Sequence, residues 1–272
     1  MRKRILFFLA VLTVAVTAGS LVAQTTDDFA RVLLPVYLGG QRPGAHGAVW
    51  SDALTVMNDS DRPLVQGVDF LPFEPCPFEC GQTIEPGTGQ NINFFVPEPQ
   101  AVPALLMQVR RPLVERLFMT LRVWEQSRPV RQATRVPLVR EEEFRSNPLN
   151  LVLVEKSSAV HRTLLRIYEL DAAPGATVRV HAFELFGGRP VADRLVRLTV
   201  PIERYEPQFG GGPVYPGYAE VPLDDTFFGP GLDPRFVFRI RVEPVVAGQR
   251  LWSMVSVTEN GTNEFTLITP EP

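Results

Sequence analysis

Cysteine and histidine are scarce in this chain, and the scarcity excludes several kinds of site. Cys76 and Cys80 are the only cysteines. Their C-x3-C spacing differs from the C-x2-C of redox and zinc motifs, and no second pair of ligands follows. The three histidines, His46, His161 and His181, lie far apart in sequence, and no G-x-S-x-G motif marks a nucleophile. We therefore expect no metal, no cofactor and no catalytic residue, and a chain that is not an enzyme.

Long apolar runs are also absent beyond the first residues. Residues 1–23 combine a basic start at Arg2, Lys3 and Arg4, an apolar run from Ile5 to Val16, and small residues near Ala23. This pattern is typical of a signal peptide, and the run is short for a membrane helix of about 20 residues. We expect a secreted or periplasmic protein whose mature chain has no membrane span.

The charge balance argues against a nucleic-acid partner. Lysine and arginine total 27 and aspartate and glutamate total 30, which gives a net charge of −3. Removal of residues 1–23 takes away three basic residues and no acidic one, so the mature chain is more acidic still. Nucleic-acid binding needs an excess of basic residues. In an exported protein the same reasoning about address predicts a local disulfide between Cys76 and Cys80.

Proline is abundant, and its placement predicts an all-β fold. The chain has 26 prolines in 272 residues. A proline inside a helix costs about 3 kcal/mol, so long helices are not expected. The prolines separate short runs rich in valine, leucine and phenylalanine, and residues 160–186 read as two alternating strands joined by DAAPGA.

The chain contains an internal repeat. Leu54 and Val56 align with Leu165 and Ile167, which lie 111 residues later. Residues 116–128 align with 250–262 at a spacing of 134. Between these segments, a spacing of 113 brings Val65, Phe70 and Phe73 onto Val178, Phe183 and Phe186. Matched segments in one order predict two copies of one domain.

We therefore expect two tandem immunoglobulin-like antiparallel β-sandwiches, spanning residues 24–141 and 142–272. Strands without crossover helices pair antiparallel, and two stacked sheets bury their apolar faces. Residues 200–228, rich in tyrosine, proline and glycine, depart from the repeat. They are interpreted as either a functional loop or a cover over an open sheet edge.

Two family resemblances follow from these segments. HRTLLRIYEL, SVTENGTNEFTLITP and, more loosely, WSDALTVMNDS resemble poorly characterised secreted bacterial proteins with Ig-like domains, a family that implies no known reaction. LTVMNDSDRPLVQGVDF and TIEPGTGQNINF are similar to the first domain of periplasmic pilus chaperones. That resemblance implies an arginine and a lysine in a cleft between domains. Arg31 is a candidate for the first, whereas Lys156, the only lysine outside the signal peptide, falls in the second half.

Aromatic residues on outward strand faces are the candidate binding residues. Alternation places Phe118 and Trp124 opposite the apolar face of their strand, and Trp252 shares that face in the second copy. Such side chains stack on sugar rings or peptide when exposed, or are covered by the long loop or the other domain. The expected function is non-catalytic binding of an unknown protein or glycan at the cell surface. Chaperone action by strand addition and carbohydrate binding are the alternatives, and a calcium ion between the acidic loops at 58–61 and 223–225 stays open.

Overall fold

The computed structural model describes residues 28–71, 81–92, 103–201, 213–233 and 235–271. The predicted signal peptide and the predicted Cys76–Cys80 disulfide both lie outside these residues. The described part of the chain is all-β, as expected, and every pairing between its strands is antiparallel. Its one α-helix is α2 (Asp225–Phe228). None of the described helices is long and apolar enough to span a bilayer.

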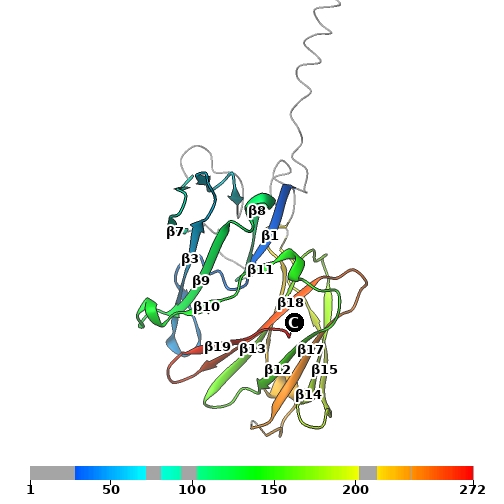
Figure 1. Ribbon diagram of the computed structural model, residues 1–272. Helices are drawn as coiled ribbons and strands as arrows, with labels where there is room; N and C mark the ends of the chain where they lie inside the picture. Colours follow the sequence, from blue (N-terminus) through cyan, green and yellow to red (C-terminus); the bar gives the residue numbers. More distant parts are fainter. Residues whose placement is uncertain (1–27, 72–80, 93–102, 202–212, 234, 272) are drawn as a thin grey trace, which may run out of the picture.

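The first part of the chain builds an N-terminal pair of sheets (Figure 1). Sheet 1 has the order β11-β1-β8-β5, and sheet 2 has the order β10-β9-β3-β2 with β7 also paired to β3. A separate ribbon pairs β4 with β6. The strands are β1 (Phe29–Leu34), β2 (Arg42–Pro43), β3 (Val49–Asn58), β4 (Leu64–Val65), β5 (Phe70–Leu71), β6 (Thr83–Ile84), β7 (Gly89–Ile92), β8 (Leu105–Arg110), β9 (Leu117–Glu125), β10 (Thr134–Val136) and β11 (Val139–Arg140).

The remainder of the chain builds a C-terminal pair of sheets. Sheet 3 has the order β12-β17-β14-β15, and sheet 4 has the order β16-β13-β18-β19. The strands are β12 (Leu149–Glu155), β13 (His161–Glu169), β14 (Thr177–Glu184), β15 (Pro190–Arg197), β16 (Gly217–Pro222), β17 (Val237–Pro244), β18 (Leu251–Glu259) and β19 (Phe265–Ile268). Short 3-10 turns connect some strands of the N-terminal pair, namely η2 (Ala45–Gly47), η3 (Arg111–Leu113), η4 (Val130–Gln132) and η5 (Glu141–Glu143).

The strand register repeats between the two pairs. Leu54 of β3 lies opposite Leu121 of β9, and Leu165 of β13 lies opposite Val255 of β18. These partners differ by 111 and 134 residues, the same two spacings that the sequence repeat predicts. The order of pairing is shared as well, because β7-β3-β9-β10 in sheet 2 corresponds to β16-β13-β18-β19 in sheet 4.

One segment of the sequence alignment is wrong. Phe70 is fully buried and pairs with Val109, whereas Phe183 is partly exposed, with the guanidinium of Arg239 over its ring, and Phe186 is 83% exposed. The residue of β14 that faces the core is Ala182. Since side chains alternate along a strand, an alignment that is off by one residue places the counterpart on the opposite face.

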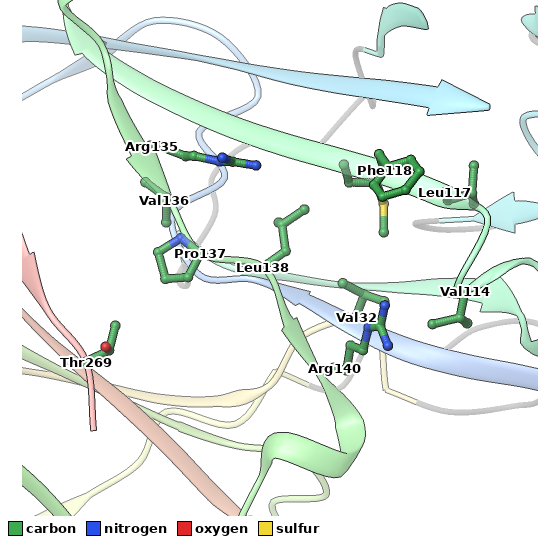
Figure 2. A pocket seen from close by; sticks show the side chains of 11 residues that line it. Val32, Val114, Leu117, Phe118, Arg135, Val136, Pro137, Leu138, Arg140 and Thr269 are labelled. Atoms are coloured by element: carbon green, nitrogen blue, oxygen red, sulfur yellow. The ribbon is translucent and has the colours of Figure 1, made fainter. Parts of the chain in front are cut away.

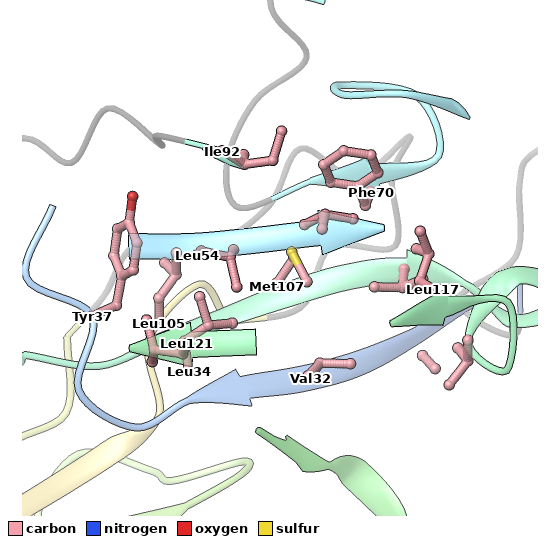
Figure 3. Close-up of a cluster of buried hydrophobic side chains, with 14 of the residues drawn as sticks. Val32, Leu34, Tyr37, Leu54, Phe70, Ile92, Leu105, Met107, Leu117 and Leu121 are labelled. Carbon is pink, nitrogen blue, oxygen red and sulfur yellow. The ribbon is translucent and has the colours of Figure 1, made fainter. Parts of the chain in front are cut away.

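Each pair of sheets encloses its own hydrophobic cluster. In the N-terminal pair, side chains such as Val32 and Met107 of sheet 1 meet Leu54 and Leu121 of sheet 2, as Figure 3 shows. In the C-terminal pair, Ile240 and Val180 of sheet 3 meet Leu165 and Val255 of sheet 4. Alternate residues of each strand supply these clusters, which is why the period of two in the sequence predicts them.

A third cluster joins the two pairs. It brings the outer face of sheet 1 against the outer face of sheet 4 and contains Leu33, Ala104, Leu106, Val139, Phe144, Tyr168, Leu170, Tyr218, Trp252 and Met254. Val214 and Tyr215, from the end of the 200–228 loop, are buried in the N-terminal cluster, and the backbone N–H of Leu106 donates to the Val214 carbonyl at 2.7 Å. The described end of this loop therefore covers sheet 1.

The strand order departs from that of an immunoglobulin domain. As there, the second and fifth strands of the C-terminal pair are neighbours (β13, β16), and so are the third and sixth (β14, β17). The first strand, however, lies beside the sixth, and the seventh lies beside the second. The first and seventh strands have thus exchanged sheets, and the N-terminal pair shows the same exchange.

Candidate functional site: a cavity between the two sheet pairs

A cavity of about 680 Å³ lies between the N-terminal and C-terminal sheet pairs, and we call it the central cavity. It receives side chains from both pairs, including Arg42, Trp50, Arg162, Arg166, Ser256 and Phe265. Neither pair forms it alone. Its volume lies within the range of about 300–1,000 Å³ that is usual for small-molecule sites.

The floor of the central cavity is the outer face of sheet 4. Along β13 the side chains of Thr163, Leu165 and Ile167 point into the C-terminal core, so Arg162 and Arg166 point outward. At one end of this face Tyr168 is covered by sheet 1 within the third cluster. Beyond the reach of sheet 1 the same face becomes the cavity floor, joined there by Ser256 and Thr258 of β18 and Glu220 of β16.

The wall on the N-terminal side centres on Trp50, at the start of β3. Its ring meets the ring of Phe265 edge to face, with 5.4 Å between centroids and an interplanar angle of 81°. Gly44 is required beside it, because a Cβ at that position would lie 2.4 Å from Trp50 Nε1. The loop from β2 to β3 thus holds the indole against β19 of the other sheet pair. In the repeat Trp50 corresponds to His161, since the two pair with Glu125 and Glu259.

Arg162 is held by neutral partners. Its Nη1 and Nη2 donate to Asn260 Oδ1 at 3.1 Å and to Asn263 Oδ1 at 3.2 Å. Asn263 has a positive φ of 55°, a conformation that asparagine tolerates better than most residues. No described carboxylate forms an ion pair with Arg162. Burial lowers the pKa of this guanidinium, and no neighbouring anion offsets the effect. The side chain is therefore positioned without being neutralised.

Arg166 is held by an ion pair instead. Its Nη2 lies 2.9 Å from Glu220 Oε1, and its Nη1 donates to Ser256 Oγ at 2.7 Å. Only 16% of the Arg166 side chain is exposed, so Glu220 compensates a largely buried charge. Of the two arginines on the cavity floor, Arg162 is the one whose charge a ligand meets.

The residues suggested by the chaperone resemblance do not line this cavity. Arg31 on β1 pairs with Glu141 at 3.1 Å and with Asp171. Lys156 is buried and donates to the carboxylate of Asp225 and to the Leu232 carbonyl. Sequence reasoning missed Arg162 and Arg166. Their spacing of four residues within an alternating strand was the available signal, because it places both on one face.

The three predicted binding residues lie in different surroundings. Phe118 is 57% exposed and lies beside a second cavity, of about 530 Å³, between β9 and the Val136–Val139 segment that crosses from sheet 2 to sheet 1 (Figure 2). Trp124 is half-buried on the outer face of sheet 2, opposite Ser51. Trp252 is only 6% exposed and packs against Tyr168 in the third cluster, so the covered alternative applies to it. The structure does not bring the three together.

A serine and a histidine meet in the turn between β12 and β13. Ser158 Oγ lies 3.2 Å from His161 Nδ1, while His161 Nε2 lies 3.0 Å from the Lys156 carbonyl oxygen and 3.3 Å from Glu155. The same Ser158 Oγ accepts the backbone N–H groups of Val160 and His161. These contacts close a local turn, and neither Ser158 nor His161 lines a cavity described above.

The acidic loops are engaged in contacts of their own. Asp224 Oδ1 accepts from the Thr226 N–H at the start of α2, and Asp225 pairs with Lys156. Within the part of the chain that the structure describes, no three histidine, cysteine, aspartate or glutamate side chains converge as a metal site would require. No family model, curated protein or solved structure matches the chain.

Proposed function

We propose that this chain is an exported, non-catalytic binding protein built of two Ig-like β-sandwiches in tandem. Its ligand is a protein or glycan of the cell surface, and the ligand occupies the central cavity. The Ig-like assignment rests on the shared neighbours β13–β16 and β14–β17 and treats the exchanged first and seventh strands as a variant of that order.

The observation that carries this proposal is the state of Arg162. A half-buried guanidinium without a carboxylate partner is costly to fold around, because a buried charge normally needs compensation. Here two asparagine side chains orient it toward a cavity that also holds aromatic rings. A cavity with aromatic walls and a few placed polar groups is the usual form of a binding site.

The test fills the cavity and measures ligand binding. Leu164 lines the central cavity between Arg162 and Arg166, and L164W places an indole there. The matched control is L195W on the edge strand β15, where Leu195 is 64% exposed. We expect labelled wild-type protein and L195W to bind the same members of a glycan and peptide array, and L164W to lose them. Equal binding by L164W, or no binding by the wild type, contradicts the proposal.

Strand addition, as in a periplasmic chaperone, is the second candidate function. The outer edge of β15 has no strand partner among the described residues, and the cavity between the sheet pairs contains three arginines. Charged residues Asp193, Arg194 and Arg197 interrupt that edge, which disfavours unselective pairing. A peptide that binds by strand addition is expected to lose affinity when a proline replaces its central residue, whereas a ligand held only in the central cavity is not bound through backbone hydrogen bonds.

A further inference from the structure

We propose that the central cavity binds a carbohydrate carrying one carboxylate, a hexuronate, with the carboxylate on Arg162 and the sugar ring beside Trp50. This assignment rests on the proposed function and names the ligand class of the same site. Three sets of observations lead to it: the charge of the cavity, the chemistry of its walls and the part of the sheet that forms its floor.

The charge of the cavity favours a ligand with a single negative charge. Arg162 offers a guanidinium whose two printed bonds go to neutral amides, so it retains donors for a carboxylate. Arg166 is already paired with Glu220, and the carboxylate of Asp224 also lines the cavity. A ligand with several negative charges, such as a nucleotide, would meet these two carboxylates. A ligand with one charge is matched by Arg162 alone.

The walls favour a ring that carries hydroxyl groups. Trp50 and Phe265 provide an apolar surface, and Thr258, Asp224 and Glu220 provide polar atoms within the same cavity. Carboxylates accept hydrogen bonds from sugar hydroxyls, and an aromatic face packs against the C–H groups of the ring. A sugar acid presents both kinds of surface on one small molecule.

The floor disfavours an extended peptide. It is made of side chains on β13 and β18, and β13 is a central strand whose backbone groups pair with β16 and β18. On the opposite side β2 is only two residues long and includes Pro43, which cannot donate a backbone hydrogen bond. The cavity therefore offers a peptide no long strand edge, and the carboxylate of a peptide C-terminus is the competing ligand that the experiment must exclude.

The experiment compares D-glucuronate with D-glucose, which differ only in the carboxylate at C6, by isothermal titration calorimetry on the purified protein. We expect glucuronate to bind at least tenfold more tightly than glucose. R162Q, which keeps the length of the side chain but not its charge, is expected to weaken glucuronate binding at least tenfold and to leave glucose binding within twofold. R162K tests whether charge alone suffices, and we expect it to recover part of the glucuronate affinity. R194Q on the distant strand β15 is the matched control and is expected to behave as the wild type.

Each outcome decides between the two proposals. Equal affinities for the two sugars, an R162Q variant that binds glucuronate like the wild type, or tighter binding of a tripeptide with a free C-terminus overturns the hexuronate assignment. If the tripeptide binds the wild type but not L164W, the cavity is still the ligand site and only the ligand class is wrong. If L164W binds as the wild type does, the proposed function itself fails. Thermal unfolding of R162Q and R162K checks that a lost affinity is not lost folding.

Discussion

The hydroxyl of Tyr168 donates a 2.6 Å hydrogen bond to the backbone carbonyl of Pro35, across 133 residues of sequence and from one sheet pair to the other. Both groups are buried. Burial raises the pKa of Tyr168 well above its ordinary value, so the phenol remains protonated and able to donate at any pH at which the protein folds. This bond lies within the third cluster and links the two sheet pairs directly.

Replacing this tyrosine tests how strongly the two sheet pairs depend on each other. Y168F leaves the Pro35 carbonyl without its partner inside the cluster, and we expect it to lower the free energy of unfolding by about 1–3 kcal/mol. The matched control is Y218F, because the hydroxyl of Tyr218 is buried in the same cluster and has no hydrogen-bond partner. Y218F is expected to be neutral or stabilising. Urea unfolding of both variants decides the matter, and equal losses would contradict the role assigned to the Tyr168 bond.

Asp171 gives the contact between the sheet pairs a dependence on pH. Burial by itself would raise the pKa of Asp171, but hydrogen bonds from Arg31 and Arg250 outweigh burial and lower the pKa. Since the pKa is lower in the folded state, ionised Asp171 stabilises the fold above its ordinary pKa of about 3.9, and this contribution is lost as pH falls through the lowered value. Half of the side chain is exposed, so D171N is expected to cost no more than about 1 kcal/mol at pH 7. Urea titrations at neutral pH and at about pH 3 should show the difference between D171N and wild type shrinking in acid. A difference that grows in acid would contradict this sign.

Glu169 has the opposite dependence. It is 5% exposed, and burial raises its pKa although the side chain of Gln249 donates to it at 3.0 Å. A raised pKa means that the ionised form is disfavoured in the folded state, so its contribution to stability is full below the ordinary glutamate pKa of about 4.3 and is lost as pH rises through the folded value. E169Q keeps an acceptor oxygen for Gln249 and removes the charge. We expect E169Q to unfold at a higher temperature than wild type at pH 8 and at a similar temperature at about pH 4. A lower unfolding temperature at pH 8 would show that the charge is needed.

Phe118 distinguishes the central cavity from the groove beside β9 that Figure 2 shows. Because its side chain is 57% exposed, F118S is expected to change the free energy of unfolding by no more than about 0.5 kcal/mol. L121A on the same strand removes a fully buried side chain and is expected to cost about 2–5 kcal/mol. If the ligand occupies the central cavity, F118S retains the array binding of the wild type. Loss of that binding in F118S would move the site to the groove, where Phe118 was predicted to act.

Much of the fold was open to prediction because the relevant interactions are local or periodic. Alternation along β3, β9, β13 and β18 predicts which side chains enter the two cores, and the spacings of 111 and 134 residues reproduce the observed register. The alignment of Phe70 with Phe183 failed for a physical reason: near the short strand β5 the chain lacks a long alternating run, so a shift of one residue was not detected.

The candidate site was not open to prediction to the same degree. The sequence of β13 by itself determined that Arg162, Arg166 and Tyr168 share the outer face of one strand, because successive side chains point to opposite sides. Only the tertiary structure decided that sheet 1 covers Tyr168 and Trp252 while Arg162 stays at an uncovered cavity, since the residues that cover a face come from segments more than a hundred positions away. Periodicity assigns a side chain to a face, and packing between distant segments determines whether that face becomes core, interface or binding site.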